Sequence, residues 1–115
     1  MESKRKIERI YIATPVNGRQ EETLEEKKMM AACRCEMLKQ ILSEDYPEAK
    51  MLTSFDVCPR DERIEESEAM GRCIGHLLTA DAIYLDHGWN VSKGCNLEYR
   101  AAKIYGLVIL EHDKM

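Results

Sequence analysis

Four short, mostly apolar runs divide the chain, and each has the length of a buried β-strand. The first run is rich in β-branched and aromatic residues, and its apolar residues do not alternate strictly with polar ones. That pattern is typical of strands covered on both faces. The runs predict strands at 9–14, 50–55, 82–85 and 107–110.

Three longer segments between these strands carry apolar residues at spacings of three and four, which predicts amphipathic helices. The segments lie at 21–42, 65–79 and 94–105, with Thr23 as a possible cap of the first and Gly106 as the stop of the third. The expected inward-facing residues are Met30, Cys33 or Arg34, Met37, Leu38 and Ile41, then Ala69, Met70, Cys73, Ile74, Leu77 and Leu78, then Leu97, Ala101 and Ile104.

The regular alternation of strands and helices predicts an α/β fold. Parallel strands joined by right-handed helical crossovers form a three-layer αβα sandwich of flavodoxin or Rossmann type. We expect four to five strands, with a fifth coming from 54–64, and the pattern leaves the strand order open. A length of 115 residues predicts a single domain over 1–115.

Composition narrows the classes of function. The chain is 44% hydrophobic and 33% charged, as in globular proteins, and its net charge of −4 argues against binding a nucleic-acid polymer. Neither a signal-peptide pattern nor an apolar run long enough to cross a membrane is present. The five cysteines form no CxxC pair. We therefore expect a cytoplasmic protein with reduced thiols, no metal site and no cofactor.

Candidate chemistry gathers in the segments that follow the strands, at 14–20, 55–63 and 86–94. In a parallel sheet these segments meet at the carboxyl edge, where α/β domains bind small molecules. Ser92 and Gly94 stand at a predicted helix start, which favours a phosphate or carboxylate ligand. The residues expected to face a ligand there are Arg19, Asp56, Asp86, His87, Trp89, Ser92 and Glu98.

Glu98 lies about one turn into the third predicted helix, on the flank of its apolar face. A carboxylate is costly to bury there unless it is hydrogen-bonded or has a chemical task. The positive helix end would help to keep it ionised, as a nucleophile requires. An exposed Glu98 with an i,i+4 partner is the competing interpretation, just as Arg19 is either an anion ligand or a solvated surface residue.

Three segments carry a resemblance to a known family. They are Tyr11-Ile-Ala-Thr-Pro-Val-Asn-Gly18, Ala80-Asp81-Ala-Ile, and Gly88-Trp-Asn-Val-Ser92-Lys-Gly94-Cys-Asn-Leu-Glu98-Tyr-Arg-Ala-Ala102. Together they resemble the nucleoside 2-deoxyribosyltransferase-like superfamily, nearest its small branch of domains of unknown function. The Ser-x-Gly-x-x-x-Glu element is also similar to that of the 2'-deoxynucleoside 5'-monophosphate N-glycosidases in this superfamily.

The resemblance implies a catalytic site for a nucleoside or nucleotide. Glu98 falls on the nucleophile that attacks C1' of the deoxyribose, and Tyr11 falls on a group near the sugar and this carboxylate. Ser92 would contact the 5' end, Arg19 a 5'-phosphate, and Trp89 would stack on the base or close the pocket. Relatives complete such sites across a subunit contact, which implies a homodimer or higher homo-oligomer.

One position departs from the family pattern. Relatives carry an Asp where this chain has Cys73, and that Asp helps to position the substrate. Asp86, Asp56 or Glu66 takes over its role, or the activity is weakened, altered or absent. Two other interpretations therefore stand beside an enzyme: a non-catalytic nucleotide or nucleotide-sugar binding module, and a subunit-assembly domain without a ligand.

Overall fold

A computed structural model describes residues 6–16, 23–58 and 64–111. Its centre is a four-stranded, all-parallel sheet in the order β2-β1-β3-β4. The α/β fold predicted from the sequence is confirmed. The bounds of the strands are β1 (Arg9–Ala13), β2 (Lys50–Thr53), β3 (Ala82–Leu85) and β4 (Val108–Glu111).

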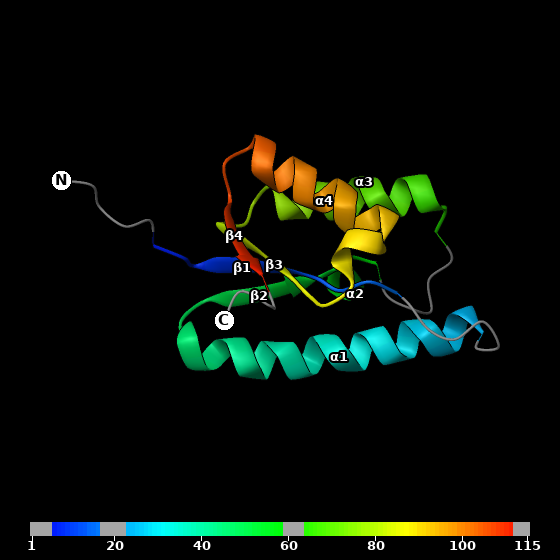
Figure 1. Cartoon of the computed structure of the whole chain (residues 1–115), viewed down its shortest axis with the longest axis horizontal. Coiled ribbons are helices and arrows are strands. Elements are labelled where there is room, and N and C mark those ends of the chain that lie inside the picture. Colours follow the sequence, from blue (N-terminus) through cyan, green and yellow to red (C-terminus); the bar gives the residue numbers. More distant parts are fainter. Residues whose placement is uncertain (1–5, 17–22, 59–63, 112–115) are drawn as a thin grey trace.

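Helices cover both faces of the sheet and make three layers (Figure 1). The long helix α1 (Leu24–Asp45) lies along one face, and α3 (Glu66–Leu77) and α4 (Lys93–Ile104) lie side by side on the other. Two short helical turns, α2 (Ser54–Val57) and η1 (Trp89–Val91), follow strands β2 and β3. Within the described residues, no helix is both long and apolar enough to cross a bilayer.

The second strand ends earlier than the sequence predicts. Thr53 is its last residue, and the Thr53 hydroxyl accepts hydrogen bonds from the backbone amides of Phe55 and Asp56. This cap turns the chain into α2, so Phe55 is helical. Residues 54–57 therefore provide no fifth strand, and 59–63 lie outside the described residues.

Side chains of the central strands alternate between two cores. Tyr11 and Ala13 of β1 point toward α3 and α4, whereas Ile10 and Ile12 point toward α1. All four are buried. This alternation places the Tyr11 side chain on the same side of the sheet as the buried faces of α3 and α4.

The predicted inward face of α1 is wrong, apart from Leu38. The helix buries Ala31, Cys35, Leu38 and Leu42, while Met30, Cys33, Met37 and Ile41 are exposed and Arg34 is half-buried. Met30 is 56% exposed. Small residues at 31 and 35 suit close packing on the sheet at one end of this face, and Leu38 and Leu42 fill the other end.

The buried face of α4 also differs from the predicted one, whereas the predicted buried face of α3 is confirmed. In α3, Cys73 and Leu77 are buried and the other predicted residues are half-buried. In α4 the buried residues are Cys95, Glu98 and Ala102, whereas Leu97 and Ile104 are exposed and Ala101 is half-buried. A carboxylate thus occupies a core position of the last helix.

Local capping signals read from the sequence are confirmed. Thr23 and Glu26 form a reciprocal capping box at the start of α1. Gly106 has φ of 75°, a left-handed conformation that ends α4 without a side-chain clash. Asp81 accepts hydrogen bonds from the amides of Glu8 and Arg9 at 2.9 and 3.1 Å. Asp81 therefore caps the amino edge of the sheet, opposite the predicted site.

Candidate functional site

A buried pair of polar side chains forms the centre of the candidate site. Glu98 of α4 is 5% exposed, and the hydroxyl of the fully buried Tyr11 donates a hydrogen bond to Oε2 of its carboxylate. Tyr11 comes from β1, so residues far apart in the sequence meet under the first turns of α4. The structure thus rules out the exposed Glu98 that was the competing interpretation.

The electrostatics of this pair follow from its burial. Desolvation raises the pKa of Glu98 to about 7, and the hydrogen bond from Tyr11 acts in the opposite direction. Burial, together with the neighbouring Glu98, raises the pKa of Tyr11 well above its usual value. Near neutral pH, Glu98 is therefore present in both its ionised and protonated forms, and Tyr11 remains a hydrogen-bond donor.

Glu98 lies in the wall of an open cavity of about 410 Å³. The residues that line this cavity come from α2, α3 and the start of α4, and from the segment at the end of β1. The Ser92 hydroxyl accepts a hydrogen bond from the Cys95 amide at 3.3 Å, so Ser92 caps α4 at the cavity rim. The lining residues are Thr14, Val16, Ser54, Glu66, Met70, Cys73, Val91, Ser92, Lys93, Gly94, Cys95 and Glu98.

Gly94 and Met70 approach each other closely in this wall. A Cβ added to Gly94 would come within 3.0 Å of the terminal methyl of Met70. The glycine therefore leaves room for the Met70 side chain beside the cavity. The sequence predicts Ser92, Gly94 and Glu98 together at one helix start, and in the structure all three line this one cavity.

Cys73 occupies a central position in the site. It is 4% exposed, lines the Glu98 cavity and is a neighbour of Tyr11. Burial raises the pKa of the Cys73 thiol to about 11, so it is neutral at physiological pH. Of the three carboxylates considered as substitutes for the missing Asp, Glu66 lines this cavity, and Asp86 and Asp56 do not.

Asp86 is bound by an arginine on the other side of the sheet. Arg34 of α1 donates to both of its carboxylate oxygens, through Nε at 3.0 Å and Nη2 at 2.8 Å. The amide of His87 donates to Oδ1 as well. Asp86 is 2% exposed and lines a neighbouring cavity of about 590 Å³ that also includes Thr14. The apolar pattern of α1 gave no signal for this role of Arg34.

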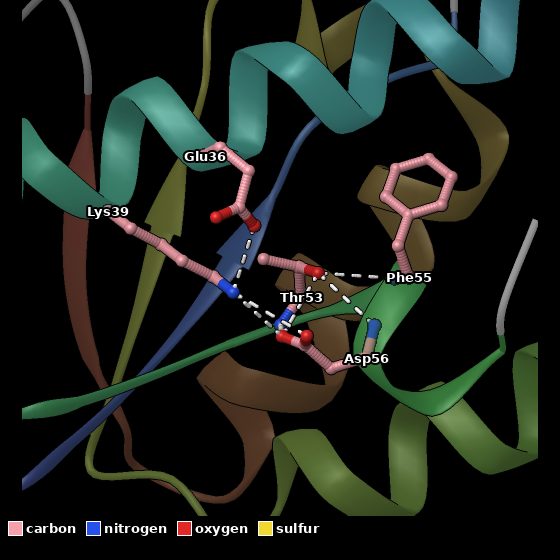
Figure 2. A network of polar contacts seen from close by, with 5 residues as sticks. All are labelled: Glu36, Lys39, Thr53, Phe55 and Asp56. Atoms are coloured by element: carbon pink, nitrogen blue, oxygen red, sulfur yellow. Dashed lines mark hydrogen bonds and ion pairs between the residues drawn. The ribbon is translucent and has the colours of Figure 1, made fainter.

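Asp56 has a capping role at the end of β2 (Figure 2). Its carboxylate accepts hydrogen bonds from the amide and hydroxyl of Thr53, and it pairs with Lys39 of α1 at 3.3 Å. Lys39 also pairs with Glu36 at 3.1 Å. Figure 2 shows that this network ties α1 to the turn after β2. Asp56 therefore stands beside the carboxyl edge and outside the cavity of Glu98.

Trp89 packs on α4, with its ring 4.8 Å from that of Tyr99 at an interplanar angle of 45°. It lines a third cavity, of about 430 Å³, between the strand ends and η1. Val91 lines both this cavity and that of Glu98, so Trp89 lies close to the site without entering it. Arg19 lies outside the described residues.

Several residues of the Glu98 cavity were not predicted to contact a ligand. Thr14, Ser54 and Met70 line it. Thr14 lies within the first segment of the family resemblance, and Met70 was expected only as an inward-facing residue of its helix. Only their positions at the strand end and helix starts could have indicated them. Among the described residues, no group of three or more His, Cys, Asp or Glu side chains is placed to hold a metal ion.

Comparison with known proteins finds one family match, over almost the whole chain. No curated protein matches the sequence. Residues 8–111 match the family described as "Domain of unknown function (DUF4406)". This match runs from the start of β1 to the end of β4 and includes Tyr11, Cys73 and Glu98. The chain therefore belongs to the DUF4406 family.

Proposed function

We propose that the protein breaks the N-glycosidic bond of a deoxynucleoside or its 5'-monophosphate, as a hydrolase or a 2-deoxyribosyltransferase. The observation that carries the proposal is Glu98, a buried carboxylate in a cavity wall that receives a hydrogen bond from Tyr11. A buried ionisable group with a strongly shifted pKa in a cavity marks a candidate catalytic residue. The resemblance to the nucleoside 2-deoxyribosyltransferase-like superfamily supports the same chemistry.

The proposed reaction has two displacements at C1'. Tyr11 binds Oε2 of Glu98, and we assign the attack on C1' to Oε1 of the ionised carboxylate. The base leaves with the electrons of the glycosidic bond and takes up a proton, and a glycosyl ester of Glu98 remains. Water or a second base then attacks C1' from the opposite face, gives up a proton to solvent, and releases Glu98 as its carboxylate. Two inversions give net retention.

The site lacks a second buried carboxylate at the family position, because Cys73 stands there. Glu66 is the remaining carboxylate of the cavity, at the first residue of α3. It is highly exposed and lies 3.9 Å from Lys93 across the rim. We infer that Glu66 contacts the substrate at the cavity mouth, whereas Cys73 offers a neutral thiol next to Tyr11.

The decisive experiment exposes the wild-type protein to a panel of purine and pyrimidine deoxynucleosides and their 5'-monophosphates. Release of free base is followed by chromatography, and intact mass reports a deoxyribosyl adduct. We expect base release from at least one compound and an adduct that maps to the peptide containing Glu98. If no compound of the panel loses its base, the proposed activity is wrong.

A second candidate function is a binding module for a nucleotide or nucleotide sugar, without turnover. Cys73 in place of the family Asp favours it. Calorimetry distinguishes the two functions, because a module binds the ligand and returns it intact. Binding with micromolar affinity but no base release and no adduct would favour the module.

Arg19 is expected to recognise a 5'-phosphate. Arg19→Ala should weaken binding or turnover of monophosphates about tenfold more than that of the matching nucleosides, since one charged hydrogen bond contributes about 1.5–3 kcal/mol. KM measured for each nucleoside and monophosphate pair tests this, with Arg100→Ala, a change on α4, as the control. Equal weakening of both ligand types would contradict a phosphate contact.

We also propose that the chain forms a homodimer or a higher homo-oligomer, as the resemblance implies. The exposed apolar residues Met30, Met37 and Ile41 of α1 offer a contact surface. Light scattering should give at least twice the mass of the chain. Met37→Glu should lower the association, whereas Gln40→Glu, one turn away on the same exposed helix, should change it less. A monomer at all concentrations would contradict the proposal.

A further inference from the structure

Two cysteine side chains meet behind the candidate active site. Cys58 follows α2 directly, and its thiol donates a hydrogen bond to the carbonyl of Ala69 at 3.8 Å. Ala69 and Cys73 are four residues apart, so they share one face of α3. Cys58 packs against the core cluster that contains Cys73. Burial raises the pKa of the Cys73 thiol, and the neighbouring Cys58 thiol raises it further, so the two side chains lie close together.

This thiol pair is connected to Glu98 through Tyr11. The Cys73 thiol is a neighbour of Tyr11, and the Tyr11 hydroxyl donates a hydrogen bond to Glu98. Cys58 is half-buried, whereas Cys73, Tyr11 and Glu98 are buried. The four side chains therefore form a continuous chain of contacts from a partly accessible thiol to the proposed nucleophile.

We propose that Cys58 and Cys73 form a reversible disulfide when the protein meets a peroxide, and that this disulfide switches the Glu98 site off. The effect on catalysis rests on the proposed function. The formation of the bond does not, because it follows from the thiol pair alone.

The chemistry balances with hydrogen peroxide as the oxidant. The Cys58 thiolate attacks one peroxide oxygen, which breaks the O–O bond and leaves a sulfenic acid and, after protonation, one water. Cys73 then attacks the Cys58 sulfur, its proton goes to the departing hydroxyl, and a second water leaves. Two thiols are oxidised and one peroxide is reduced. A pKa of about 11 keeps Cys73 in the thiol form, so we assign the first step to the more accessible Cys58.

The expected consequence for the site is a change at Tyr11. A sulfur atom in a disulfide has no proton, and it is drawn toward Cys58. The Tyr11 hydroxyl then has a sulfur without a proton as its neighbour, in place of a thiol. Because Tyr11 positions the Glu98 carboxylate, the oxidised protein should attack C1' more slowly.

Formation of the bond is tested in a Cys33→Ser background, which removes an exposed thiol that could link two chains. The reduced protein is treated with hydrogen peroxide, and its thiols are counted after unfolding. We expect the count to fall by two, peptide mapping to join Cys58 with Cys73, and dithiothreitol to restore both thiols. Cys58→Ser should prevent the link, whereas Cys95→Ser, which alters another buried thiol of the site, should preserve it.

Two further measurements test the switch. NMR signals of the Tyr11 ring and the Glu98 carboxyl should shift between the reduced and oxidised forms. If base release is detected, it should fall at least tenfold on oxidation and recover on reduction, except in Cys58→Ser. A protein that keeps both thiols under peroxide, or that forms the disulfide with unchanged Tyr11 and Glu98 signals, overturns the proposal. Absence of base release in the reduced protein instead contradicts the proposed function.

Discussion

Glu98→Gln is expected to abolish base release from every compound that the wild-type protein cleaves, by about a thousandfold or more. Glutamine has nearly the same shape as glutamate, and its side-chain oxygen can still accept the hydrogen bond from Tyr11. It lacks the charged oxygen that attacks C1'. The variant should therefore keep the fold and the cavity and lose the covalent intermediate. Base release and intact mass are measured on the same samples.

The control for this change is Glu68→Gln on α3. Glu68 is exposed and pairs with Arg72, so its substitution removes one carboxylate of the same chemistry away from the cavity. It should leave base release unchanged. Glu98→Ala should be as inactive as Glu98→Gln, because both lack a nucleophile. A fully active glutamine variant would remove Glu98 from the role of nucleophile.

The same Glu98→Gln substitution is expected to stabilise the protein at alkaline pH. Burial raises the pKa of Glu98 in the folded chain from 4.5 to about 7. Between these values the folded state holds a proton that the unfolded state has lost. The contribution of Glu98 to stability is therefore fully present below pH 4.5 and is lost as pH rises through 7. Glutamine is neutral at every pH, so it avoids this loss, which amounts to about 3 kcal/mol at pH 8.

Urea unfolding at several pH values measures this effect as the difference in unfolding free energy between variant and wild type. The difference should grow from pH 5 to about pH 7 and level off by pH 8. In Glu68→Gln, which replaces an exposed carboxylate, it should stay nearly constant over the same range. A difference for Glu98→Gln that does not change with pH would mean that Glu98 titrates as an ordinary carboxylate in the folded protein.

Together these two predictions describe a conflict between stability and activity at one residue. The ionised form of Glu98 is the nucleophile, and it becomes dominant only above pH 7, where its burial costs the most. Catalytic sites commonly accept such a cost, because the function needs a group that the core would otherwise exclude. The hydrogen bond from Tyr11 reduces this cost without removing it.

Much of the fold could be predicted from the sequence alone. The four apolar runs determine the strands, because a stretch of β-branched and aromatic residues such as Ile10–Ile12 has few other ways to be buried. The alternation of strands with helices determines a parallel sheet. In such a sheet the loops after β1, β2 and β3 lie together at the carboxyl edge. Local capping signals determine where some helices begin and end: Thr23 marks the start of α1, and Gly106 marks the end of α4. The spacing of Ser92, Gly94 and Glu98 determines a helix start with a carboxylate one turn later.

Only the tertiary structure decided which side of each helix is buried. The sequence pattern favoured Met30, Met37, Leu97 and Ile104. Instead, α1 covers the sheet with Ala31, Cys35, Leu38 and Leu42, and α4 covers it with Cys95, Glu98 and Ala102. A periodic pattern reports which residues share a face, whereas burial depends on how closely that face can approach its neighbour.

The partners of the polar side chains were also decided by contacts between distant segments. Arg34 reaches Asp86 from α1, Cys58 meets Cys73 across α2 and α3, and Tyr11 meets Glu98 from β1. None of these pairs is close in the sequence, and no local spacing indicates them. Packing of the layers therefore separates the ion-paired Asp86 from the Glu98 cavity, because the two carboxylates face opposite sides of one sheet.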